Sequence, residues 1–212
     1  MIGNTVGQIT TEQKIMDAAE KLFLEKGFIL STTTLIAKEA GVTHAMLHYY
    51  FRTKEQIFIK VLDKNIGELA GTLRPLMSME RPVWQTIRKG VEVLFDYLNT
   101  HRQLPGLIYD VAKHQPRLLD GYVKTSGNAL QGAVERHRSM LSQEIAGGRM
   151  NDISLKQLVY DIFSMNMSAF MAITGLRDVL HYTPEQIDAF LSEQKREIVN
   201  TVYCRLYGEI PT

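Results

Sequence analysis

The chain has 212 residues. This is enough for one large domain or two small ones, since domains cluster at about 100–150 residues. Hydrophobic residues make up 45% and charged residues 22% of the sequence, which is typical of a folded, soluble protein and excludes a disordered or fibrous one. The 24 basic and 23 acidic side chains nearly cancel, so any contact with nucleic acid has to be local rather than driven by net charge.

The sequence shows no pattern of export or membrane insertion. The N-terminal stretch MIGNTVGQ lacks the basic and apolar regions of a secretory signal, and the least polar stretch, 162–173, is interrupted by polar side chains. The single cysteine, Cys204, cannot form an intramolecular disulfide, and Cys/His zinc spacing is absent from the sequence. We therefore expect a cytoplasmic protein that uses no metal or other cofactor and does not contact a membrane.

Apolar residues recur at helical rather than alternating spacing, which predicts an all-α fold. Several helix starts are marked by Thr or Ser followed three residues later by Gln, the spacing of a capping box. These pairs are Thr10 with Gln13, Thr53 with Gln56, Ser154 with Gln157 and Thr183 with Gln186. In chain order the pattern predicts helices over about 10–26, 33–40, 44–50, 53–71, 83–101, 105–115, 117–146, 154–176 and 184–207. We place the domain boundary between residues 1–65 and 66–212.

The first domain is predicted to be a three-helix unit with a helix-turn-helix. One face of its opening helix carries an apolar stripe that can cover a small core. This stripe comprises Ile15, Ala18, Ala19, Leu22 and Phe23, and its expected partners are Ile36, Ala40, Val42, Leu47 and Phe51. Gly41 stands where the chain has to reverse within three residues, a place where a left-handed backbone suits glycine. The two short helices on either side of it therefore cross at a helix-turn-helix angle.

The short helix over 44–50 has an outward face of hydroxyls, imidazoles and a phenol. Such a face is typical of a surface that docks on a partner. A DNA major groove is about 12 Å wide and admits one such helix, whose side chains reach base edges. The candidates for base contact are Thr43, His44, Ala45, Met46, His48 and Tyr49. The candidates for phosphate contact are Thr32, Thr33, Tyr50 and Lys54.

Three stretches resemble the DNA-binding domain of the tetracycline-repressor (TetR) family. They are Gly27-Phe28, Thr32 to Thr43 (TTTLIAKEAGVT), and Leu47 to Glu55 (LHYYFRTKE). The resemblance covers about residues 10–60; the remainder matches only in length and helical character. It implies a transcriptional regulator, a repressor, with a larger C-terminal domain that binds a small-molecule effector and dimerises. Leu35, His44, Ala45 and His48 depart from residues common in the family and leave the operator sequence open.

The sequence also admits two other interpretations. The helix-turn-helix could be a packing motif in a helical enzyme or ligand carrier. His44 and His48 could share a metal, but neither an HExxH glutamate nor an obvious third ligand accompanies them, so hydrogen bonding to DNA is favoured. The sequence also lacks a GxSxG elbow and a glycine-rich phosphate loop, and we therefore expect no enzymatic activity.

The second domain is rich in methionine and aromatic residues. A helical core explains any one of them, but as a set they also suit an adaptable apolar cavity, and the resemblance implies an effector pocket here. The candidate effector-binding residues are Trp84, Phe95, Tyr109, Met140, Phe163, Met167 and Phe170. We expect an apolar or aromatic effector.

The last two predicted helices are expected to form the dimer. The apolar stripe of helix 184–207 is too wide for one neighbour, and helix 154–176 is apolar on most sides. A two-fold four-helix bundle, which the resemblance also implies, would cover both. The candidate interface residues are Phe170, Ile187, Phe190, Leu191, Ile198, Val202 and Leu206. Such a homodimer would bind a palindromic double-stranded operator with half-sites about 34–36 Å apart or somewhat further.

Overall fold

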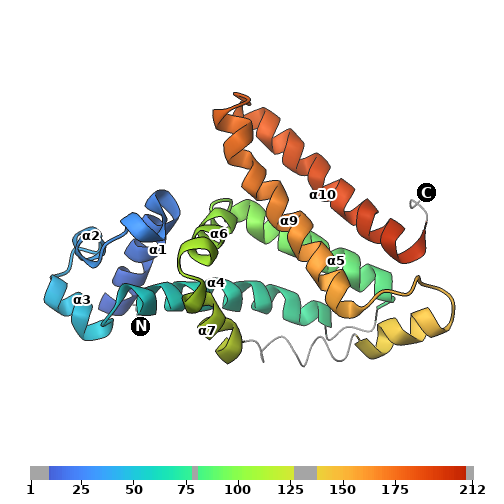
Figure 1. Ribbon diagram of the computed structural model, residues 1–212, viewed down its shortest axis with the longest axis horizontal. Coiled ribbons are helices and arrows are strands. Elements are labelled where there is room, and N and C mark those ends of the chain that lie inside the picture. The colour runs from blue at the N-terminus through green and yellow to red at the C-terminus, as the bar shows by residue number, and fades with distance from the viewer. Residues whose placement is uncertain (1–9, 78–80, 127–137, 209–212) are drawn as a thin grey trace, which may run out of the picture. The chain divides into compact units, whose positions relative to one another are not determined.

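The computed structural model describes residues 10–77, 81–126 and 138–208, and all regular secondary structure in these ranges is helical (Figure 1). The all-α prediction is confirmed. The helices are α1 (Thr11–Leu30), α2 (Thr33–Glu39), α3 (His44–Tyr50), α4 (Lys54–Met77), α5 (Val83–Thr100), α6 (Leu104–His114), α7 (Pro116–Ser126), α9 (Leu155–Asp178) and α10 (Pro184–Tyr207). Residues 138–146 are also helical, and the middle of the helix expected over 117–146 lies outside the described residues. In the ranges above, we find no helix with the length and apolar character needed to span a membrane.

The Thr and Ser caps begin the helices where the sequence places them. In each of the four pairs the cap hydroxyl accepts a bond from the backbone N–H of the Gln, at 3.2–3.3 Å. Only at Thr183 does the Gln side chain return the bond to the cap N–H, completing the box. The side chains of Gln13 and Gln157 instead donate to Asp17 and Asp161 one turn further on. The Thr/Ser and Gln spacing thus predicts the bond from the backbone N–H to the cap hydroxyl in all four pairs, but the reciprocal side-chain bond in only one of them.

Two helices differ from the sequence-based bounds. Gly27 has φ +78°, which interrupts α1 at the residue where the sequence predicts its end, but helical residues resume as far as Leu30. Helix α4 continues past Gly71 and contains Pro75. Pro75 is exposed and lies near the C-terminal end of α4. It removes one backbone hydrogen bond at that end only, and the helix tolerates this loss.

The chain folds into two compact units. The first takes in the described residues up to Gly67 together with Leu107–Tyr122, and the second takes in Glu68–Gly106 and the described residues after Tyr122. The segment 107–122 was placed in the second domain by the sequence pattern. It belongs to the first unit because Leu107, Val111 and Tyr122 are buried in that unit's core.

The core of the first unit is built around three phenylalanines. The ring centroids of Phe23, Phe28 and Phe58 lie 5.3–5.7 Å apart, two of the three pairs being edge-to-face. Such aromatic pairs contribute about 0.5–1.5 kcal/mol beyond the burial of their area. The cluster fixes the C-terminal end of α1 against α4.

Lys54 closes this junction from the outside. Its Nζ donates to the carbonyl oxygens of Phe28 at 2.7 Å and Ile29 at 3.3 Å, and it lies 4.2 Å from the centre of the Phe28 ring. Burial lowers the pKa of Lys54, against a smaller opposing effect of Glu55. The two hydrogen bonds nevertheless place the ammonium at the last carbonyls of α1, where a positive charge is favourable.

In the second unit, α5, α9 and α10 pack against one another, and Figure 1 shows α9 and α10 as a long antiparallel pair. Their shared core includes Phe95 of α5 and Phe170 of α9, whose ring centroids lie 4.9 Å apart. From α10, the buried residues are Ile187, Leu191, Ile198, Val202 and Leu206. The wide apolar stripe of α10 is thus covered on two sides within one chain, by α9 and α5.

We predict that Lys54→Met lowers the free energy of unfolding by about 1–3 kcal/mol, because it keeps the apolar stem over Phe28 but removes two charge-assisted hydrogen bonds. Urea denaturation followed by far-UV circular dichroism measures the change. Lys60→Met, at an exposed position of the same helix, is the matched control and should change stability by less than about 0.5 kcal/mol. Equal stabilities of the two variants would contradict a stabilising role for the Lys54 contacts.

Candidate nucleic-acid interface

In the turn between α2 and α3, the chain ends one helix and caps the next within a few residues. Gly41 has φ +66°. The N–H of Val42 bonds the carbonyl of Ala37 at 3.0 Å, and that of Gly41 bonds the carbonyl of Lys38 at 3.2 Å, as in a Schellman ending. Thr43 then accepts a hydrogen bond from the N–H of Met46 at 3.2 Å and begins α3. A side chain at position 41 would strain this turn, because its backbone is left-handed.

Helix α3 exposes nearly its whole surface. Leu47 is fully buried, whereas the other six side chains of the helix are exposed, Tyr49 to 83%. Phe51, directly after the helix, supplies the second buried anchor. A helix so weakly embedded presents its side chains to a partner rather than to its own core.

The exposed side chains of α3 are ordered by contacts among themselves and with α2. His44 Nε2 lies 3.1 Å from Thr33 Oγ1, which bridges the two helices. The rings of His44 and His48 meet edge-to-face at 4.3 Å, and those of Tyr49 and Tyr50 do so at 5.2 Å. The face is therefore preorganised, which lowers the entropy lost on binding.

Several of the candidate DNA contacts also have a structural role. The hydroxyls of Thr32 and Thr43 cap α2 and α3, and Thr33 is engaged by His44. Lys54 directs its ammonium at the end of α1 and keeps at most one N–H for another acceptor. The fully outward members are Ala45, Met46, His48, Tyr49 and Tyr50.

Negative charge is sparse around this face. Between Ser31 and Lys54 the only acidic residue is Glu39, and its carboxylate is paired with Lys21 at 2.5 Å. The Lys21 partner lowers the pKa of Glu39, through a hydrogen bond first and its charge second. Glu55, exposed beside Lys54, is the next carboxylate along the chain, so apart from the paired Glu39, negative charge lies at the edge of this face rather than within α2, the turn or α3.

The structure does not gather the seven candidate effector residues into one site. Phe95 and Phe170 are packed together in the core of the second unit, whereas Tyr109 belongs to the first unit and is 55% exposed. Phe163 and Met140 lie at the surface, Met167 is half-buried, and Trp84 packs edge-on against Tyr203 with ring centroids 4.8 Å apart. Shared composition was thus not enough to predict shared location.

Most of the candidate dimer residues are buried within the single chain. Six of the seven, Phe170, Ile187, Leu191, Ile198, Val202 and Leu206, are at most 6% exposed within the single chain, and Phe190 is half-buried. Their partners are α5 and α9 of the same chain, so they are not available to a second copy. The apolar side chains left uncovered are on another face, which includes Tyr160, Phe163 and Met171 of α9. The sequence hinted at this face, since α9 is apolar on most sides.

Comparison with known proteins connects this geometry to a family. Residues 15–61 match the family profile described as bacterial regulatory proteins, tetR family. The chain is 25% identical over 108 residues to the HTH-type transcriptional activator FasR of Mycolicibacterium smegmatis, covering 51% of this chain and 49% of FasR. It is 23% identical over 111 residues to the HTH-type transcriptional repressor KstR2 of Rhodococcus jostii, covering 52% and 54%. The alignments thus span about half the length of these relatives.

The whole fold is also found among solved structures. A TetR transcription regulator from Haloarcula marismortui superposes with a TM-score of 0.68 at 15% identity, covering 92% of this chain and 98% of that one. The matched profile spans α1 to the first half of α4 and so includes the exposed helix α3 and its turn. Residues 15–61 are therefore similar to the tetR family of bacterial regulatory proteins, and the fold is similar to that of a TetR transcription regulator.

Proposed function

We propose that this protein is a homodimeric transcriptional repressor that binds a palindromic double-stranded DNA operator and is released from it by a small-molecule effector. The observation that carries the proposal is α3, a helix with one buried side chain and six exposed ones, within the stretch that matches the family profile. The name of KstR2, a repressor, agrees with the proposed sign of regulation, whereas FasR is named an activator.

In this proposal α3 enters the major groove. Ala45, Met46, His48 and Tyr49 supply apolar, imidazole and phenol groups for base edges. Thr32, Thr33, Tyr50 and the remaining N–H of Lys54 lie beside them and would contact phosphates, with Thr43 and His44 at the start of the helix. Phosphate contacts orient the domain, and base contacts provide the sequence preference.

The proposed dimer uses the uncovered face of α9. Tyr160 is 64%, Phe163 47% and Met171 40% exposed, and they follow one another at helical spacing along one side of the helix. A single recognition helix contacts too few bases for a specific site, and two copies related by a two-fold axis would double the contact. A second copy packed on this face would cover the apolar surface and set the operator symmetry.

The effector is proposed to bind in the core of the second unit. Asn166 of α9 is fully buried; its Nδ2 donates to the Ile162 carbonyl at 2.8 Å, but its Oδ1 has no hydrogen-bond partner within the described structure. An unpaired buried oxygen costs about 1–3 kcal/mol, which a ligand donor would recover. An apolar or aromatic effector with one hydrogen-bond donor would supply the missing partner of this oxygen. It would release DNA by binding one conformation of the protein more tightly than the other.

We predict that Tyr49→Ala weakens binding to a selected operator by roughly tenfold or more, because a base contact is worth about 1–3 kcal/mol, while binding to random duplex stays unchanged. Fluorescence anisotropy at one fixed salt concentration measures both affinities. Tyr109→Ala, an exposed tyrosine of the same unit outside α2 and α3, is the control. Operator affinity equal to wild type would remove α3 from the DNA interface.

Phe163→Asp is expected to give folded monomers that no longer bind the palindrome, because it places a charge where a second copy would pack. Val202→Asp is expected instead to unfold the second unit, since Val202 is 1% exposed and a buried unpaired charge costs several kcal/mol. Light scattering and thermal unfolding distinguish the two results. A Phe163→Asp dimer with undiminished operator affinity would overturn the α9 interface.

Asn166→Leu should leave the unliganded protein as stable as wild type or more so, since it removes the unpaired oxygen. A thermal-shift screen of apolar and aromatic compounds that carry one hydrogen-bond donor should raise the melting temperature of wild type more than that of this variant. Hits confined to highly charged metabolites, or equal shifts in both proteins, would contradict the proposed effector site.

A further inference from the structure

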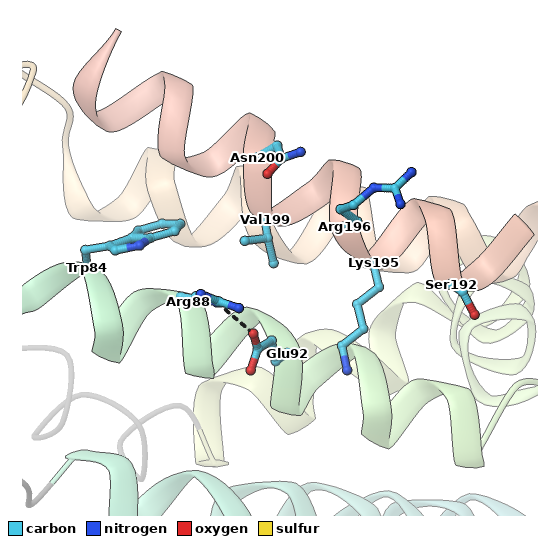
Figure 2. A pocket seen from close by; sticks show the side chains of 8 residues that line it. All are labelled: Trp84, Arg88, Glu92, Ser192, Lys195, Arg196, Val199 and Asn200. Atoms are coloured by element: carbon cyan, nitrogen blue, oxygen red, sulfur yellow. Dashed lines mark hydrogen bonds and ion pairs between the residues drawn. The ribbon is translucent and has the colours of Figure 1, made fainter. Parts of the chain in front are cut away.

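Helices α5 and α10 leave a cleft between them on the second unit, with a volume of about 300 Å³. This is at the small end of the range of about 300–1,000 Å³ found for ligand pockets. Figure 2 shows Trp84 at one end of the cleft, Arg88 next to it, Val199 and Glu92 in the middle, and Lys195, Arg196 and Ser192 toward the other end. The cleft contains none of the candidate DNA contacts, and Trp84 is the only candidate effector residue in it.

Trp84 gives the cleft an aromatic wall held in place from behind. Its ring meets Tyr203 at 4.8 Å and Tyr207 at 6.3 Å between centroids, both nearly perpendicular. The side chain is half-buried, so part of the ring remains in contact with the cleft. A planar apolar group can stack there, with Val199 beside it.

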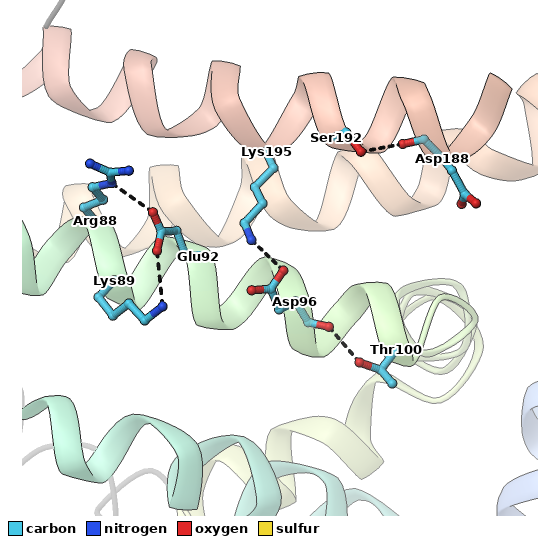
Figure 3. A network of polar contacts seen from close by, with 8 residues as sticks. All are labelled: Arg88, Lys89, Glu92, Asp96, Thr100, Asp188, Ser192 and Lys195. Atoms are coloured by element: carbon cyan, nitrogen blue, oxygen red, sulfur yellow. Dashed lines mark hydrogen bonds and ion pairs between the residues drawn. The ribbon is translucent and has the colours of Figure 1, made fainter. Parts of the chain in front are cut away.

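Beyond Trp84, the cleft carries cations with unused donors. Arg88 donates through Nε to Glu92 at 2.9 Å, and its two terminal nitrogens contact no other protein group in the part of the chain described. Lys195 gives one of its three N–H groups to Asp96 at 2.6 Å (Figure 3). The planar fork of a guanidinium matches the oxygens of a carboxylate or sulfonate.

The carboxylate in the lining of the cleft is already paired. Glu92 is the only carboxylate that lines it, and it binds Lys89 at 3.4 Å as well as Arg88. Burial tends to raise the pKa of Glu92, but its hydrogen bonds to Arg88 and Lys89 outweigh burial and lower it, so the group stays ionised near neutral pH. The lining has three cations, each with an acidic partner: Arg88 pairs with Glu92, Lys195 with Asp96, and Arg196 with Glu193 at 3.4 Å and Glu197 at 3.8 Å. An anion would therefore be held by the N–H donors that these pairs leave unused rather than by an excess of positive charge.

We propose that this cleft binds a planar organic anion, with its ring against Trp84 and its carboxylate or sulfonate on Arg88 and Lys195. Binding does not require the ion pairs to break, because Arg88 keeps its terminal nitrogens and Lys195 keeps two N–H groups for the ligand. Glu92 also remains paired with Lys89 when Arg88 turns toward an anion. This site is independent of the proposed regulatory function.

The test uses the fact that Trp84 is the only tryptophan of the chain. Titration of the full chain with 8-anilinonaphthalene-1-sulfonate should quench Trp84 emission saturably by energy transfer. Arg88→Gln and Lys195→Gln should each weaken this binding about tenfold, as expected for the loss of one charge-assisted hydrogen bond. Arg177→Gln, which removes an exposed arginine paired with Asp178 on α9, is the matched control and should bind as wild type does.

Two outcomes would overturn the proposal. One is equal affinity of wild type, Arg88→Gln and Lys195→Gln for the sulfonate. The other is equal affinity for N-phenyl-1-naphthylamine, which has the same rings without the charge and would then report only apolar surface. Thermal unfolding of each variant checks that the fold is intact, and the two substitutions lie on different helices, so the result does not depend on a single variant.

Discussion

The burial of Leu47 is the constraint on which the proposed DNA-facing surface depends. A helix of two turns is not stable by itself in water, so α3 exists only because this side chain, followed by Phe51, is held in a core formed by other helices. With one anchor inside, every other side chain of α3 is free to face a partner. Tyr49 is thus exposed because Leu47 alone holds the helix in the core.

That core is assembled from parts distant in sequence. Phe23 and Phe28 come from the two sides of the break at Gly27, and Phe58 comes from α4. Lys54 binds the carbonyls at the end of α1 and so ties the residue after the helix-turn-helix to the residues before it. A side chain that could contact phosphate is therefore also part of the scaffold, and its loss would affect stability and binding together.

In the second unit, the apolar faces of α9 and α10 differ in how far the rest of the chain covers them. The apolar stripe of α10 is buried within one chain, because α9 and α5 pack on its two sides. On α9, by contrast, Asn166 is buried and its Oδ1 has no hydrogen-bond partner among the described residues, while Phe163 is 47% exposed. These two residues, three apart, support different proposals, one for an effector and one for a second subunit.

The sequence by itself determined the features that depend on near neighbours along the chain. Cap spacing located the starts of α1, α9 and α10, and Gly41 located the turn, because these contacts span only a few residues. The tertiary structure alone decided which face meets which. It moved 107–122 into the first unit, placed Val202 in the core and left Phe163 exposed, because a helical stripe shows that a face is apolar but not what covers it.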